Sequence, residues 1–178
     1  MWGCIIAELV MVWKISNSVA KENRSLATTT LMFIIFSALN GVTLSSIFVL
    51  FAPAAIVKTF VITAGTFGVM AAYGYFTSRD LTKIGGLLFM ALIGVIIASV
   101  VNMFLHSSGL DLVVSIIGVL VFVGLTAWDS QQIKMSLAMA PDLGETSQKL
   151  ALTGALSLYL DFVNLFLYLL RFFGGSRD

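Results

Sequence analysis

The sequence predicts an all-α integral membrane protein with six transmembrane helices. Of its 178 residues, 59% are hydrophobic and only 11% are charged, whereas a soluble domain of this length carries roughly a quarter charged residues. The apolar residues gather in runs of about twenty, which is the length of a helix that crosses a bilayer. The net charge is +1, so there is no basic field to attract nucleic acid. The lipid bilayer is therefore the expected partner.

Six hydrophobic segments are separated by short polar joins. The first has only about twelve apolar residues, interrupted by Glu8, and spans roughly 18 Å of a hydrocarbon core about 30 Å thick. Short joins predict antiparallel neighbouring helices. No Ser/Gly-rich linker or strong repeat divides the chain, so residues 1–178 are expected to form a single domain. The segments are residues 2–13, 26–51, 54–76, 84–105, 112–133 and 150–173.

The last hydrophobic segment carries a single polar stripe. Its polar residues follow one another at helical steps of three and four, so they share one face. The remaining faces are apolar, and a polar stripe is expected to face the interior of a bundle rather than lipid. The sequence therefore predicts a central C-terminal helix with the other helices wrapped around it. The stripe consists of Thr153, Ser157, Asp161, Asn164 and Tyr168.

Two aspartates within hydrophobic segments are the main candidates for a functional site. Asp129 lies near the end of the fifth segment, and Asp161 lies near the middle of the sixth. A carboxylate in hydrocarbon needs a proton, a partner or water. If the two side chains meet, they cannot both ionise cheaply and would share a proton, as a pH sensor does. Their oxygens also suit Ca²⁺. Separate structural hydrogen bonds for each aspartate are the alternative.

Other polar residues have supporting roles in this interpretation. Asn164 and Ser157 lie three and four residues from Asp161 on the same stripe and are expected to support it. Glu8 faces either the bundle interior or the outer interface. His106 lies in a short turn without a surrounding cluster of ligands, which favours a surface residue over a metal ligand.

The basic residues divide unequally between the two sides of the membrane. Seven of the ten Lys and Arg residues fall on one side, which the positive-inside rule assigns to the cytoplasm. The C-terminus is then expected outside, with Lys58, Arg171 and Arg177. The cytoplasmic set is Lys14, Lys21, Arg24, Arg79, Lys83, Lys134 and Lys149.

Four stretches of the chain resemble the Bax inhibitor-1 family (transmembrane Bax inhibitor motif proteins), and specifically its bacterial members. The resemblance implies a bundle of seven helices in the bacterial inner membrane, with the last helix at its centre. It also implies a pH-sensitive Ca²⁺ leak with a di-aspartyl pair at Asp129 and Asp161. The stretches are ALNGVTLSSIF (38–48), YGYFTSRDL (73–81), GLTAWDSQQIK (124–134) and LSLYLDFVNLF (156–166).

The chain departs from the family pattern in two respects. The family's opening helix is expected to be missing, which agrees with the short first segment. The family's arginine that locks one aspartate has no secure match, and Arg24 and Lys21 are the candidates for that lock. Glu8 matches an acidic or amide position of the family's second helix.

The leading hypothesis is a pH-sensitive Ca²⁺ leak, in which Ca²⁺ is the transported or bound ion and no cofactor is involved. The alternative is a non-conducting regulator that binds a membrane-bound AAA protease or other membrane proteins, or suppresses cell death. An enzyme is disfavoured. Aspartyl intramembrane proteases have Tyr-Asp and Gly-x-Gly-Asp motifs, whereas here Trp128 precedes Asp129 and Leu160 precedes Asp161.

Overall fold

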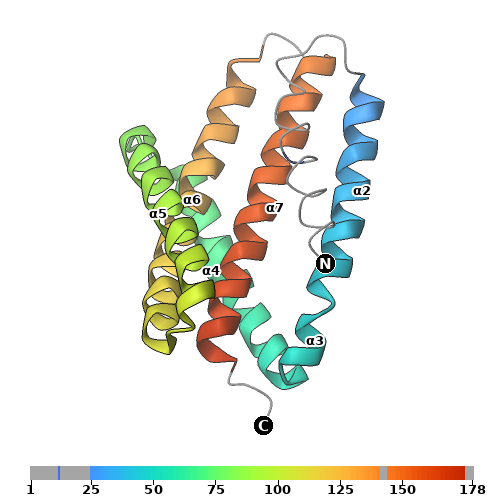
Figure 1. Ribbon diagram of the computed structural model, residues 1–178. Coiled ribbons are helices and arrows are strands. Elements are labelled where there is room, and N and C mark those ends of the chain that lie inside the picture. The colour runs from blue at the N-terminus through green and yellow to red at the C-terminus, as the bar shows by residue number, and fades with distance from the viewer. Residues whose placement is uncertain (1–11, 13–24, 141–143, 175–178) are drawn as a thin grey trace. The chain divides into compact units, whose positions relative to one another are not determined.

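The computed structural model describes residue 12 and residues 25–140 and 144–174, and its regular elements there are all α-helices (Figure 1). Five stretches are long and apolar enough to cross a membrane: α2 together with α3, and each of the four helices that follow. The helices are α2 (Leu26–Leu44), α3 (Ile47–Leu50), α4 (Pro53–Phe76), α5 (Thr82–Leu105), α6 (Ser108–Ala138) and α7 (Glu145–Phe173).

The predicted all-helical membrane class is confirmed, but the predicted number of six helices is not matched. Five candidate spans lie in the part of the chain that the structure describes. The predicted first segment, residues 2–13, lies outside the described residues except for Val12.

The predicted segment 26–51 is divided into α2 and α3 at two serines. The hydroxyl of Ser45 donates to the carbonyl of Val42 at 2.6 Å, and that of Ser46 donates to Thr43 at 2.9 Å. Such local bonds compete with the helical ladder and favour a break.

The helix α6 is longer at both ends than the predicted segment 112–133. At its start, the hydroxyl oxygen of Ser107 accepts the backbone N–H of Leu110 at 3.3 Å, which satisfies one of the unpaired donors of the first turn. Asp111 adds a negative charge to that turn, where the helix dipole favours it. Polar caps of this kind lie outside the apolar run, so hydropathy did not detect them.

The helices form two compact units. Unit 1 comprises Met1–Leu50 and Ile133–Ser157, and unit 2 comprises Phe51–Gln132 and Leu158–Asp178. Both α6 and α7 contribute residues to each unit.

In unit 1 the first turn of α7 is tied to the first turn of α2. The Glu145 carboxylate accepts the backbone N–H of Leu26 at 2.6 Å and pairs with Lys149 at 3.2 Å. Lys149 is buried, with 7% of its side chain exposed, and Glu145 compensates its charge.

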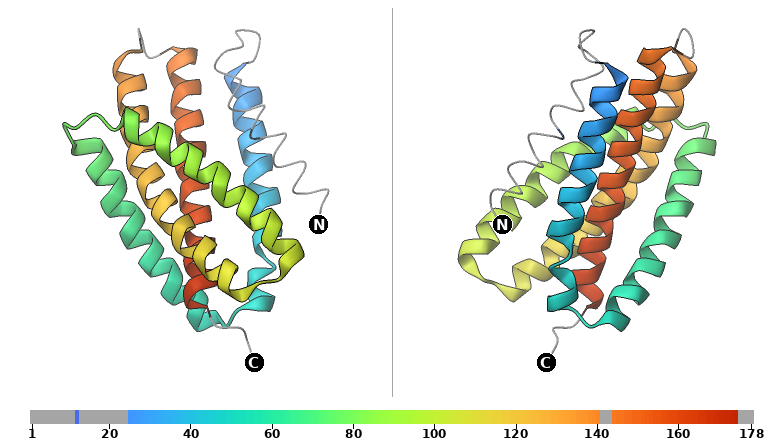
Figure 2. Two further views of the ribbon diagram at one scale, coloured as in Figure 1. Left: turned by 60° about the vertical axis from the view of Figure 1, so that its left-hand side comes forward. Right: turned by 90° about the vertical axis from the view of Figure 1, so that its right-hand side faces the viewer.

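In unit 2 a single apolar core joins α5, α6 and α7, and α4 and α5 both pack against α6 (Figure 2). Burial is concentrated on two helices: 44% of the apolar stretch of α6 and 33% of that of α7 are buried, against 17% or less for α2, α4 and α5. The predicted inner position of α7 is therefore shared with α6. The core consists of Val95, Val114, Val121, Phe122, Leu125, Leu165 and Leu169.

Candidate functional site

The stretch of α6 just before Asp129 is in close contact with two neighbouring helices through glycines. A side chain at Gly74 of α4 would overlap with the main chain of Ala127, and one at Gly85 of α5 would overlap with the Trp128 indole. Small residues permit close approach of helices in lipid, where apolar side chains provide no hydrophobic drive for association. The backbone before Asp129 is thus held from two sides.

The two residues after Asp129 bond to α4 and to the turn that follows it. The Ser130 hydroxyl donates to the Ala71 carbonyl at 2.8 Å. The Gln131 amide nitrogen donates to the Arg79 carbonyl at 2.8 Å, and its oxygen accepts the N–H of Leu81 at 2.9 Å. These contacts on both sides of Asp129 restrict the rotation of α6 at this position, and therefore the direction of the carboxyl group.

The position of Asp161 on α7 follows from the packing of that helix on α6. Tyr168, two turns further along, stacks on Phe122 with ring centroids 5.8 Å apart, and Gly118 leaves room for its ring. Asp161 and Tyr168 are seven residues apart and share one face of the helix. The face that carries Asp161 is therefore turned toward α6.

The structure brings the carboxyl groups of Asp129 and Asp161 close enough to interact. A carboxylate can only accept a hydrogen bond, so a hydrogen bond between the two would require one of them to carry a proton. Asp161 is 5% exposed, and its Oδ2 is enclosed without a hydrogen-bond partner among the described residues. Asp129 is half-buried. Chemically, the pair can take up or release a proton.

The pair alone does not make a complete site for a divalent cation. No group of three or more His, Cys, Asp or Glu side chains suited to a metal occurs within residues 25–140 and 144–174. Ca²⁺ takes six to eight oxygen ligands, so Asp129 and Asp161 would need carbonyl or water oxygens in addition. Their predicted role as Ca²⁺ ligands stays a prediction.

Of the predicted supporting and lock residues, the structure describes only Asn164 and Ser157. The Asn164 amide donates to the carbonyl of Leu160 in its own helix at 2.8 Å, and Ser157 is a half-buried residue one turn before Asp161. Glu8, Lys21 and Arg24 lie outside the described residues, so their predicted roles remain predictions.

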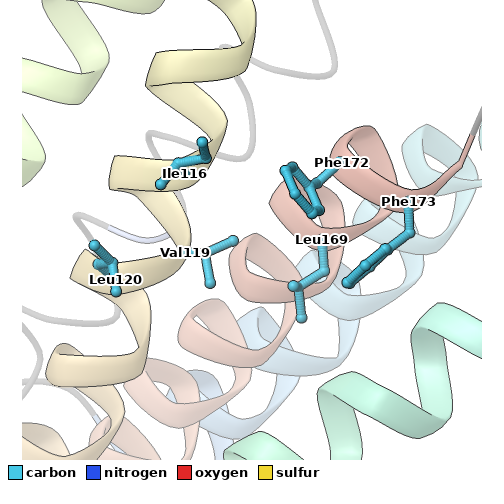
Figure 3. Close-up of a pocket in the computed structure, with 6 residues that line it drawn as sticks. All are labelled: Ile116, Val119, Leu120, Leu169, Phe172 and Phe173. Atoms are coloured by element: carbon cyan, nitrogen blue, oxygen red, sulfur yellow. The ribbon is translucent and has the colours of Figure 1, made fainter.

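His106 is exposed and ends α5 in the left-handed conformation, with φ at 49°. Near it, Arg171 of α7 pairs with Asp111 of α6 at 3.3 Å and lies over the Tyr168 ring at 5.8 Å. Beside this pair, α6 and α7 form an apolar cleft of about 260 Å³. Figure 3 shows its lining side chains, which are Ile116, Val119, Leu120, Leu169, Phe172 and Phe173.

Sequence reasoning did not identify the residues that hold the pair in place. Gln131 and Ser130 were quoted only as part of a motif, and Gly74 and Gly85 were given no role at the site. The hydrogen-bond partners of Gln131 and Ser130 lie 50 or more residues away in the chain. No local pattern reveals which helix a buried amide will reach.

The chain is similar to known bacterial proteins over most of its length. A family model described as "Inhibitor of apoptosis-promoting Bax1" matches residues 1–178. Inner membrane protein YbhL of Escherichia coli K12 is 51% identical over 177 residues, which are 98% of this chain and 74% of YbhL. A Borreliella burgdorferi protein is 51% identical over 174 residues, which are 98% of this chain and 74% of that protein. Protein RP147 of Rickettsia prowazekii is 48% identical over 154 residues, which are 86% of this chain and 65% of RP147.

Proposed function

This chain belongs to the Bax inhibitor-1 family of membrane proteins, and from that premise we propose that it is a passive, pH-sensitive Ca²⁺ leak of the bacterial inner membrane. Asp129 and Asp161 form the pH-sensing element. The gain or loss of their shared proton shifts the packing of α6 against α7, and this shift opens or closes a path for cations.

The observation that carries the proposal is that the carboxyl groups of buried Asp161 and half-buried Asp129 lie close enough to interact. If the pair loses its proton, two negative charges remain about 4 Å apart, and their repulsion is about 4 kcal/mol at an effective dielectric constant of about 20. Each 1.4 kcal/mol corresponds to a tenfold change in an equilibrium constant. This repulsion therefore changes the equilibrium constant between two conformations by about a thousandfold. Such a change is large enough for a gate.

The basic residues support an orientation for this leak. Arg79 and Lys83 follow α4, Lys134 lies near the end of α6 and Lys149 near the start of α7. With this side in the cytoplasm, we place the C-terminus outside. Labelling of a cysteine added after Asp178, by an impermeant reagent on intact cells with the outer membrane permeabilised, tests this orientation.

The test of function is Ca²⁺ flux into proteoliposomes across about pH 5 to 8, with an entrapped fluorescent indicator. We expect wild-type flux to change with pH, and Asp161→Asn and Asp129→Asn to lose that dependence. Asp111→Asn is the matched control because Asp111 lies in α6 away from the pair, in an ion pair with Arg171. Unchanged, pH-dependent flux through Asp161→Asn would refute the role of the pair.

The same preparation separates the leak from the alternative, a non-conducting regulator that binds a membrane-bound AAA protease. That alternative gains support if no flux occurs at any pH while a protease co-purifies in stoichiometric amount. Flux without such a partner supports the leak.

A further inference from the structure

The turn between α4 and α5 carries two exposed basic side chains, Arg79 and Lys83. Neither of them forms an ion pair with a described residue. Asp80, which lies between them, caps α5 by accepting the N–H of Thr82 at 2.9 Å, and Lys83 attracts its carboxylate only at longer range. The turn therefore presents two cations beside one carboxylate that is already bonded.

The backbone of this turn is held in place within unit 2. The N–H of Arg79 donates to the Thr77 hydroxyl oxygen at 3.3 Å, and its carbonyl accepts the Gln131 amide at 2.8 Å. The oxygen of the Gln131 side chain accepts the N–H of Leu81 at 2.9 Å. A fixed backbone reduces the conformational entropy that the basic side chains lose when they bind a ligand.

The turn lies at the surface of the membrane. The helices α4 and α5 have 24 residues each, about 36 Å of helix, which exceeds the hydrocarbon thickness of about 30 Å. Tyr75, near the end of α4, is 50% exposed, and tyrosines of membrane helices concentrate at the level of the lipid headgroups. Arg79 and Lys83 therefore lie at the level of the lipid phosphates.

From Lys83 toward the membrane centre, one face of α5 is apolar and exposed. Leu87 and Met90 follow Lys83 at helical steps of four and three, so they share its face, and they are 64% and 63% exposed. Gly94 continues this face, and a Cβ there would meet no atom within 4 Å. Figure 2 shows α5 on the outside of unit 2, and only 11% of its apolar stretch is buried. An apolar surface thus begins directly beside a cation.

The length of this surface corresponds to one leaflet of the bilayer. Gly94 comes eleven residues after Lys83, about 16 Å along the helix axis, and half of the hydrocarbon core is about 15 Å thick. An acyl chain whose headgroup lies at Lys83 therefore ends near Gly94. The apolar surface would accept any lipid chain, whereas the unpaired cations favour a headgroup with a net negative charge.

We propose that the α4–α5 turn and this face of α5 bind one anionic phospholipid of the adjoining leaflet. The Arg79 guanidinium and the Lys83 ammonium hold the phosphodiester, and an acyl chain lies along Leu87 and Met90 as far as Gly94. A guanidinium can donate two parallel N–H bonds to phosphate oxygens, and an ammonium acts as a compact point charge.

The test is lipid binding by the purified full chain in detergent, measured by native mass spectrometry. The probes are phosphatidylglycerol and phosphatidylcholine with the same acyl chains, and we expect the anionic lipid to bind more tightly. Arg79→Gln and Lys83→Gln should each weaken phosphatidylglycerol binding about fivefold, while Lys83→Arg should retain it. Lys58→Gln is the matched control, because it removes an exposed cation elsewhere in unit 2.

Two results would overturn the proposal. Equal binding of the two lipids, or phosphatidylglycerol binding that is unchanged when both Arg79 and Lys83 are replaced by Gln, would indicate ordinary boundary lipid only. A dimer that retains no lipid would show that a second copy of the chain covers α5.

The position of the acyl chain has its own variant. Gly94→Leu places a side chain on the path of the acyl chain and should reduce the affinity for both lipids. Gly68→Leu is its control on α4, since the space around Gly68 is equally open. Equal affinities in these two variants would contradict the proposed path.

The lipid site is linked to the carboxyl pair through Gln131, two residues after Asp129. A lipid that binds the held turn stabilises the folded protein, so phosphatidylglycerol should raise the unfolding temperature of the wild type more than that of Gln131→Met. An equal rise would argue against this link. Lipid binding is measured without ion flux, so the lipid site and the Ca²⁺ leak can fail separately.

Discussion

Gln131 is the residue whose replacement tests most directly how the site is held together. Its side chain is 6% exposed and makes two hydrogen bonds to the turn between α4 and α5, to the Arg79 carbonyl and the Leu81 N–H. Gln131→Met keeps the length and nearly the volume of the side chain but removes both bonds. The main effect is therefore on hydrogen bonding and not on packing.

The expected cost of Gln131→Met follows from these bonds. Each net hydrogen bond contributes about 0.5–1.5 kcal/mol, and the N–H of Leu81, a residue 6% exposed, is left buried without a partner, at about 1–3 kcal/mol. Since these costs overlap, we expect a loss of about 2–4 kcal/mol in the free energy of unfolding. For a chain of this size the unfolding temperature falls by about 5–15 °C.

Thermal unfolding in detergent, followed by tryptophan fluorescence, measures the loss, and limited trypsin digestion locates it. The released turn should be cut faster after Arg79. Gln132→Met is the matched control, with an expected cost of less than about 0.5 kcal/mol. If Gln131→Met unfolds within about 2 °C of wild type and is cut no faster after Arg79, the turn is not held by this amide.

Two further predictions concern helix contact and pH. Gly85→Ala should destabilise the protein by about 1–3 kcal/mol, because the new methyl group overlaps with the Trp128 indole. Gly86 has open space around it, so Gly86→Ala should stabilise the protein by about 0.5–1 kcal/mol. Changes of the same sign in the unfolding temperatures of the two variants would contradict this prediction. The hydrogen bonds from Thr82 hold the pKa of Asp80 below its ordinary value of 3.8, so its stabilising contribution is complete above that value and is lost as the pH falls through the lowered pKa. Asp80→Asn should therefore reduce the fall in unfolding temperature between about pH 5 and pH 2, and an equal fall in both proteins would argue against it.

The membrane class and most helix positions followed from local patterns. An apolar run of about twenty residues has to form a helix in lipid, because only a helix pairs its own backbone groups within one segment. The predicted segments 54–76 and 84–105 accordingly agree with α4 and α5 to within two residues. Two of the boundaries that differed, at the start of α6 and within residues 26–51, depend on serine hydroxyls that hydropathy does not weigh.

The polar stripe of α7 was also predicted from the sequence, since helical spacing alone places Asp161 and Asn164 on one face. The stripe indicated that this face avoids lipid, and Asp161 is indeed buried. It did not indicate which partner each polar group would find. Asn164 bonds within its own helix, while Asp161 reaches a different helix.

The pairing of Asp129 with Asp161 was decided by tertiary structure. The two residues are 32 positions apart on separate helices, and their depths depend on how far α6 and α7 slide and rotate against each other. That register is set by shape, through the room that Gly118 leaves for Tyr168 and the close approach of α4 at Gly74. Periodicity tells which face of a helix is polar, but only the interlocking of side chains across helices determines which polar faces meet.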